Sequence, residues 1–212
     1  RTDVAGGAIL QFFGCALRGI IVVEAAGNGA QDLDDPFYDQ PGPSFPDTWT
    51  NPFRRAADSG AILVGAGAPP SGLFGPDRSR LDFSNFGSRL DCQGWGRGVV
   101  TTGYGDLFGG GDDAFRTMAY TAAFSGTSSA SPIVTGVLAC LQGIARARGR
   151  NLDPATARGL LRETGSPQMA AGSFAPVSQR KGTTMQAQES VAAGRAAAPS
   201  AAWGAVFAMT LC

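Results

Sequence analysis

One short stretch of the sequence places a hydroxyl where it could act as a nucleophile: residues 126–132, Gly-Thr-Ser-Ser-Ala-Ser-Pro. The apolar residues that follow recur every three or four positions, which predicts a helix beginning here. We expect Pro132 in its first turn, where a missing N–H costs nothing. Ser128 would then lie at the positive end of the helix dipole, where backbone N–H groups stabilise an oxyanion. A serine that only caps the helix is the alternative. The apolar residues are Ile133, Val134, Val137, Leu138, Leu141 and Ile144.

A side-chain amide upstream is the second group that could do chemistry. Asn28 follows residues 20–25, a continuous apolar and β-branched run that is typical of a parallel strand buried on both faces. An amide at the end of such a strand can donate a hydrogen bond to an oxyanion. The alternative is an asparagine in left-handed conformation within a Gly-Asn-Gly turn.

Together these two stretches resemble the nucleophile motif and the oxyanion-hole strand of the subtilisin-like serine proteases, the subtilases, in that family's order. The resemblance implies an α/β fold, a three-layer sandwich with a mainly parallel sheet, incomplete at its N-terminal side. It also implies a secreted serine-type endopeptidase. Ser128 would attack a peptide carbonyl to give an acyl-enzyme, while the Asn28 amide and the Ser128 N–H hold the tetrahedral oxyanion.

The resemblance also implies which residues contact the polypeptide substrate. Ala25, Ala26 and Gly27 would line one wall of the S1 pocket, with Thr127 as a further substrate-binding residue. Small side chains along such a wall leave room for a substrate residue.

The chain has no histidine, although a Ser–His–Asp mechanism needs an imidazole to accept the serine proton. By the resemblance, the chain begins in the middle of the peptidase domain. We therefore expect the catalytic Asp and His from an upstream segment, and no hydrolysis by the 212 residues alone. Residues 58–60, Asp-Ser-Gly, imitate the family's aspartate motif, but they precede a strand and follow Asn28, so we predict a turn.

Two other functions remain open. A sedolisin-like acid peptidase uses carboxylates in place of histidine, so the missing imidazole is compatible with it. The oxyanion residue in those relatives is an aspartate, however, where this chain has Asn28. The second alternative is a non-catalytic remnant of a protease fold.

The composition limits the class of partner. An apolar fraction of 43% with 16% charged residues is typical of a globular chain. Seventeen basic residues balance seventeen acidic ones, so nothing favours nucleic acid or an anionic membrane. We also find no apolar run that looks long enough to span a bilayer. The expected partners are a polypeptide substrate and the upstream half of the domain.

No cofactor is required for the chemistry, but a structural calcium ion is a weak possibility. Asp32, Asp34 and Asp35, with Asp39 nearby, gather carboxylate oxygens of the kind that calcium prefers. A solvated acidic turn is the favoured interpretation.

The four cysteines show no metal-binding spacing. Cys15 and Cys140 fall on the apolar faces of expected helices and are interpreted as packing thiols. A bond between Cys92 and Cys212 is conceivable, and the pairing stays open.

Further elements are expected around these residues. The pattern predicts a helix over 4–18 with Ala8, Phe12, Cys15 and Leu17 facing inward, strands at 61–67, 90–92 and 99–101, and a helix from 154 to about 163 capped by Asp153. Residues 80–87 resemble a Phe-Ser-Asn-Phe-Gly segment of the family. The peptidase domain is assigned to 1–167, and 168–212 to an Ala/Gly/Ser-rich tail with a weak helix over 186–197. The strand at 20–25 is expected to lack its parallel neighbour, which leaves an edge open to aggregation.

Overall fold

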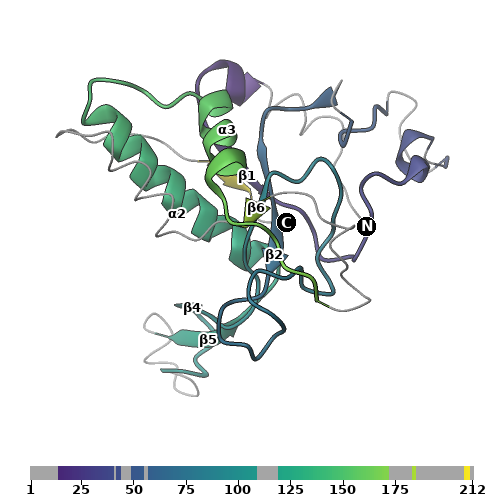
Figure 1. Ribbon diagram of the computed structural model, residues 1–212, viewed down its shortest axis with the longest axis vertical. Helices are drawn as coiled ribbons and strands as arrows, with labels where there is room; N and C mark the ends of the chain where they lie inside the picture. Colours follow the sequence, from purple (N-terminus) through teal and green to yellow (C-terminus); the bar gives the residue numbers. More distant parts are fainter. Residues whose placement is uncertain are drawn as a thin grey trace.

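The computed structural model describes residues 14–40, 42–43, 49–54, 57–108 and 119–171, and the backbone of two short strands at 183–184 and 208–210. The predictions for Ala8, Phe12, Cys212 and the helix at 186–197 lie outside these residues. A five-stranded sheet forms the centre (Figure 1). All its neighbouring strands are parallel, in the order β6-β3-β2-β1-β7. Its strands are β1 Val22–Ala25, β2 Ile62–Gly67, β3 Cys92–Trp95, β6 Thr183–Thr184 and β7 Ala208–Thr210. The predicted α/β fold with a mainly parallel sheet is therefore confirmed.

The edge of β1 is not open in the way that the sequence suggested. The backbone of β7 runs parallel to β1, with Val22 opposite Ala208 and Glu24 opposite Thr210. The expectation that β1 lacks a neighbour on this side is therefore wrong. Both β6 and β7 come from residues 168–212, so the segment interpreted as a loose tail adds a strand to each edge of the sheet.

Two helices, α2 Thr127–Arg146 and α3 Pro154–Thr164, pack on one face of the sheet (Figure 1). Four residues of the predicted apolar stripe of α2 belong to this core, Val134, Val137, Leu138 and Leu141, whereas Ile133 and Ile144 are only half-buried. The core cluster joins side chains of β1, β2, β3, α2 and α3: Ile21, Val23, Ile62, Val64, Cys92, Ala130, Val134, Val137, Leu138, Leu141, Leu152, Ala157 and Leu161. Loop residues Leu33, Leu90 and Phe53 cover Ala26 and Leu63 on a second cluster.

Two expectations for α2 need correction. Pro132 is its sixth residue rather than part of its first turn, because the helix already begins at Thr127. Proline has no N–H, so it cannot donate the usual helical bond to the carbonyl of Ser128. By length and composition α2 is also long and apolar enough to cross a bilayer, although we expected no such segment from the sequence. Its buried residues nevertheless pack on the sheet, as those of a core helix do.

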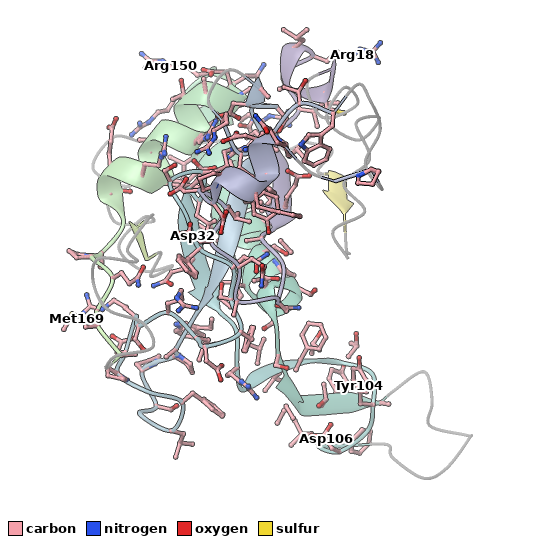
Figure 2. All side chains as sticks on the ribbon, turned by 90° about the vertical axis from the view of Figure 1, so that its right-hand side faces the viewer. Arg18, Asp32, Tyr104, Asp106, Arg150 and Met169 are labelled. Atoms are coloured by element: carbon pink, nitrogen blue, oxygen red, sulfur yellow. The ribbon has the colours of Figure 1, made fainter. Side chains whose placement is uncertain are left out.

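A hairpin projects from the carboxyl end of the sheet, formed by the antiparallel strands β4 Val99–Thr102 and β5 Tyr120–Phe124. In Figure 2 its residues Tyr104 and Asp106 lie at the opposite end of the molecule from Arg18 and Arg150. A short 3-10 helix, η1 Pro36–Asp39, follows β1. β5 leads directly through Ser125 and Gly126 into α2.

Several side chains near the helices differ from their predicted roles. Leu17, at the end of the helical residues 14–17, is 74% exposed instead of facing inward. Cys140 is exposed and Cys15 only half-buried, so neither is the fully packed thiol that was expected. Cys92 is buried and free, and burial followed by the nearby charge of Asp91 raises its pKa well above the usual range. A thiol in that state is inert.

Candidate active site

Ser128 lies at the positive end of the helix, as the sequence predicted, but as the second residue of α2 and not ahead of a first turn that contains Pro132. The helix is preceded by Gly126 with a φ of 96°, a left-handed conformation that glycine adopts without strain. Thr127 and Ser129 are each 1% exposed, whereas Ser128 between them is half-buried. The local fold therefore presents one hydroxyl at the positive end of the helix and buries its two neighbours.

The start of α2 is fixed to the carboxyl end of β3. The N–H of Gly126 donates to the Gly96 carbonyl at 3.0 Å, and the Ser129 hydroxyl donates to the Trp95 carbonyl at 3.1 Å. The strand and helix approach so closely that a Cβ on Gly94 would lie 2.6 Å from the carbonyl oxygen of Ala130. Ser128 is therefore positioned by the sheet and not by a free loop.

Asn28 lies beside this helix start, after the end of β1. Its Oδ1 accepts two hydrogen bonds from Thr127, one from the N–H at 2.8 Å and one from the hydroxyl at 3.0 Å. The Thr127 oxygen in turn accepts the N–H of Gly27 at 3.1 Å. Because a backbone N–H can only donate, Oδ1 must face Thr127, which fixes the orientation of the amide.

The same contacts leave two donors near Ser128. Within the described residues, no acceptor bonds the Nδ2 group of Asn28 or the N–H of Ser128. An ideal Cβ on Gly126 would lie 3.3 Å from Nδ2, which places this donor against the turn that enters α2. Two N–H donors at a helix N-terminus can stabilise negative charge on a bound carbonyl oxygen.

A buried residue that sequence reasoning missed holds the loop carrying Asn28. Asn85 is 2% exposed; its Nδ2 donates to the Ala26 carbonyl at 2.7 Å, and its Oδ1 accepts the N–H groups of Gly29 at 3.1 Å and Gln31 at 2.9 Å. The only signal in the sequence was its place in the segment that resembles the family's Phe-Ser-Asn-Phe-Gly string. Nothing in that string indicates contact with a loop more than fifty residues away.

The predicted substrate-binding residues differ in how they are placed. Ala26 is 8% exposed and packs against Leu33 and Leu63, so its methyl group belongs to the core rather than to an open wall. Ala25 and Gly27 are half-buried, and the space beside Gly27 is filled by Asn85. Thr127 is buried and orients Asn28.

Asp58 lies at the other end of the sheet, in the turn that precedes β2, as predicted for the Asp-Ser-Gly triplet. Its Oδ1 accepts the N–H of Gly60 at 2.9 Å, and Gly60 has a φ of 78°. The carboxylate pairs with Arg89 at 3.1 Å and Arg158 at 2.7 Å. Burial raises the pKa of Asp58, but the Arg89 charge, the Gly60 N–H and Arg158 together outweigh burial and hold that pKa below its usual value.

The acidic residues of the calcium candidate bond the protein itself. Asp32 Oδ1 accepts the N–H of Asp34 at 3.0 Å, Asp34 Oδ2 accepts the N–H of Ser88 at 2.9 Å, and Asp35 Oδ1 caps η1 through the N–H of Phe37 at 2.8 Å. In the described part of the chain, no group of three or more His, Cys, Asp or Glu side chains could hold a metal ion. Calcium binding stays a prediction.

Comparison with known proteins gives a family and a set of folds. A family model described as the subtilase family matches residues 2–204. No curated protein sequence matches the chain.

Among solved structures, the patellamide maturation protease PatA is similar with a TM-score of 0.58 and 20% identity, over 92% of this chain and 58% of that one. The prenylagaramide maturation protease PagA gives 0.54 and 18%, over 87% and 53%. A protease from Pseudoalteromonas arctica gives 0.58 and 20%, over 90% and 47%. The chain therefore spans about half the length of these proteins, and at such identities the likeness concerns the fold.

Proposed function

Because the chain belongs to the subtilase family, we propose that it forms the nucleophile-bearing part of a serine-type endopeptidase. Ser128 Oγ attacks the carbonyl carbon of a peptide bond, and the amine leaves as the acyl-enzyme forms. The observation that carries this proposal is the direct contact of Asn28 with Thr127, the residue before Ser128. It joins the two stretches on which the family resemblance depends.

The two open donors next to Ser128 suit the oxyanion of the tetrahedral intermediate. The N–H of Ser128 and the Nδ2 group of Asn28 gain an acceptor when negative charge develops on the former carbonyl oxygen. Donors that are fixed beforehand need no reorganisation during the reaction, and one such donor contributes about 10²- to 10³-fold to kcat. Asn28 is held by its other amide atom, so binding the oxyanion does not require it to release Thr127.

The general base has to come from elsewhere. The 212 residues contain no histidine, and Asp58 is held in its ion pairs at the amino end of the sheet. We therefore assign the imidazole base and its orienting aspartate to a polypeptide segment that is not in this sequence. Without that base, the Ser128 hydroxyl is too weak a nucleophile for measurable hydrolysis.

A fluorophosphonate probe tests the proposal, because it reacts with an activated serine. We expect labelling in the full-length gene product and none in the 212-residue chain by itself. Ser128→Ala should abolish labelling, and Ser125→Ala, a matched change three positions away on an exposed serine, should preserve it.

The other outcomes separate the rival functions. A folded full-length product that is never labelled would leave only the non-catalytic remnant. Labelling with peptide hydrolysis that peaks well below pH 5 would favour carboxylate chemistry of the sedolisin kind. Casein cleavage by the 212-residue chain alone, lost in Ser128→Ala, would contradict the assignment of the base to another segment.

A further inference from the structure

Asn85 is a buried side chain whose three hydrogen bonds all go to the loop that carries Asn28. One bond reaches the Ala26 carbonyl before Asn28, and two reach the N–H groups of Gly29 and Gln31 after it. We infer that Asn85 is a positioning residue of the active site: it fixes the backbone of this loop and so aims the Asn28 amide. The inference rests on the proposed function.

The Asn85 side chain has the hydrogen-bonding groups that this loop requires, and a residue without an amide would not supply them. It needs one donor for a carbonyl and one acceptor for two N–H groups, and an amide supplies both on adjacent atoms. An aspartate would keep the two accepted bonds but place a negative oxygen against the Ala26 carbonyl. An alanine would leave two N–H groups and a carbonyl without these bonds, so the loop would be free to shift.

Gly27 makes room for the amide. A Cβ on this residue, whose φ is 93°, would lie 2.7 Å from Asn85 Nδ2. The first glycine of the Gly-Asn-Gly pattern around Asn28 therefore has a packing reason in addition to the turn that it forms. The sequence suggested only the turn.

Asn85 is itself anchored to the sheet, so it can transmit a fixed position. The hydroxyl of Ser84 accepts the N–H of Ala66 in β2 at 2.9 Å and donates to the Asn85 carbonyl at 3.0 Å. The N–H of Asn85 also donates to the Gly27 carbonyl at 3.1 Å. The loop is thereby held to β2 as well as to the end of its own strand.

Asn28 is thus held at two points by two different residues. Asn85 fixes its backbone, and Thr127 fixes its side chain. Loss of the first leaves the amide tethered to Thr127 but on a loop free to shift, and a misplacement of about 1 Å is enough to lower a rate up to about 100-fold. We therefore expect Asn85→Ala to lower kcat by about 10- to 100-fold with little change in KM.

A double-mutant cycle in the full-length protease tests whether Asn85 acts through Asn28. The four proteins are wild type, Asn85→Ala, Asn28→Ala and the double variant, and kcat and KM are measured for each with one peptide substrate. If Asn85 acts through Asn28, Asn85→Ala has no further effect once Asn28 is alanine. Equal losses in both backgrounds would overturn the inference.

Asn51→Ala is the matched control. Asn51 is also a buried asparagine, 6% exposed, and it also holds a loop, through Asp39 at 2.7 Å and the N–H of Phe53 at 2.9 Å. We expect this variant to lose stability without a loss of kcat. An equal fall of kcat in Asn51→Ala would show that Asn85 matters only for general stability.

A second measurement on the 212-residue chain does not depend on activity. Amide hydrogen exchange is followed by NMR at Gly29 and Gln31, with the Leu63 N–H, which Asp91 accepts at 2.9 Å, as reference. Asn85→Ala should raise exchange at Gly29 and Gln31 and not at Leu63, whereas Asn85→Asp, which keeps both accepted bonds, should raise it less. Unchanged loop exchange overturns the positioning role, whereas raised exchange in a protein that is never labelled at Ser128 refutes the proposed function and keeps the structural role.

Discussion

The two ends of the central sheet carry polar residues in opposite states. At the amino end, the carboxylate of Asp91 is fully buried and contacts Arg89 at 2.9 Å, Arg158 at 2.6 Å and Arg162 at 3.3 Å, while accepting the Leu63 N–H. At the carboxyl end, Ser128 is half-buried and Asn28 is exposed, each with a donor that the described residues leave open.

One sheet thus carries its stabilising charges at one end and its open hydrogen-bond donors at the other. Buried charges at the amino end already have their partners, so a ligand would form few new interactions there. The cavity of about 670 Å³ beside Asp58, Arg158 and Arg162 lies at that end, yet Asp58 is paired with Arg158, and both arginines are paired with Asp91. Open donors at the carboxyl end can form new hydrogen bonds with a ligand. This fits the rule that parallel sheets bind ligands beyond the carboxyl ends of their strands.

The largest expected effect is at the amino end and concerns stability. Asp91→Asn removes a fully buried carboxylate and leaves Asp58 as the remaining acidic partner of Arg89, whose side chain is only 5% exposed. Breaking a buried ion pair by removing one partner costs about 3–5 kcal/mol, so the free energy of unfolding should fall by about that amount in urea denaturation. Asp39→Asn is the control, since its pair with Arg54 is exposed and should matter little. An unchanged urea midpoint in Asp91→Asn would contradict the conclusion that the buried charges at the amino end stabilise the fold.

The next effect belongs to the carboxyl end and concerns rate. Asn28→Asp keeps the acceptor for Thr127 but removes the Nδ2 donor, so the full-length protease should lose about 10²- to 10³-fold in kcat, or about 2.7–4 kcal/mol of transition-state stabilisation. The urea midpoint should change far less than in Asp91→Asn. A large loss of stability with unchanged kcat would give Asn28 a structural role only.

The sequence predicted the elements whose signal is local. The apolar run before Asn28, the periodic stripe of α2 and the Asp153-Pro154 start of α3 each identified an element, because a few neighbouring residues decide its type. The pairing of β1 with β7 was missed, since strand pairing joins residues far apart in sequence. The residues around 208, Val-Phe-Ala-Met-Thr-Leu, are apolar enough for a strand, but they do not indicate which strand they pair with.

The candidate site divides in the same way. Ser128 and Asn28 were found because each lies at the end of a recognisable element. The role of Asn85 was not visible, because its bonds to Gly29 and Gln31 depend on how two distant loops meet. The side chain of Ala26 was misplaced for a related reason: the sequence does not say which face of the strand end meets Leu33 and Leu63.

A smaller effect at the amino end depends on pH. Asp58 has a pKa below its usual value, so its ion pairs add stability above the unfolded pKa of about 3.9 and lose it as pH falls through the lower folded pKa. Asp58→Asn should therefore be less stable than wild type at pH 7, by less than Asp91→Asn, and the gap should close below about pH 4. Glu24, whose pKa is raised by burial and, less strongly, by the Asp58 charge, has the opposite pH dependence, and its pKa should be raised less in Asp58→Asn. Urea midpoints of both proteins from pH 3 to 7 measure this difference in stability. A difference that grows as the pH falls would contradict the lowered pKa of Asp58.

The helix that brings arginines to the amino end is stabilised by a weaker contact, its N-terminal cap. Asp153 caps α3, with Oδ1 accepting the Thr156 N–H at 2.9 Å and Oδ2 its hydroxyl at 2.6 Å. Asp153→Ala should cost about 1 kcal/mol of unfolding free energy, and Asp153→Asn, which keeps a capping oxygen, should cost less. Because α3 supplies Arg158 to the amino end and no contact to Ser128, labelling of Ser128 in the full-length product should stay at the wild-type rate. If Asp153→Ala is fully folded but its Ser128 is labelled more slowly than in wild type, a change at the amino end of the sheet affects the reactivity of Ser128 at the carboxyl end.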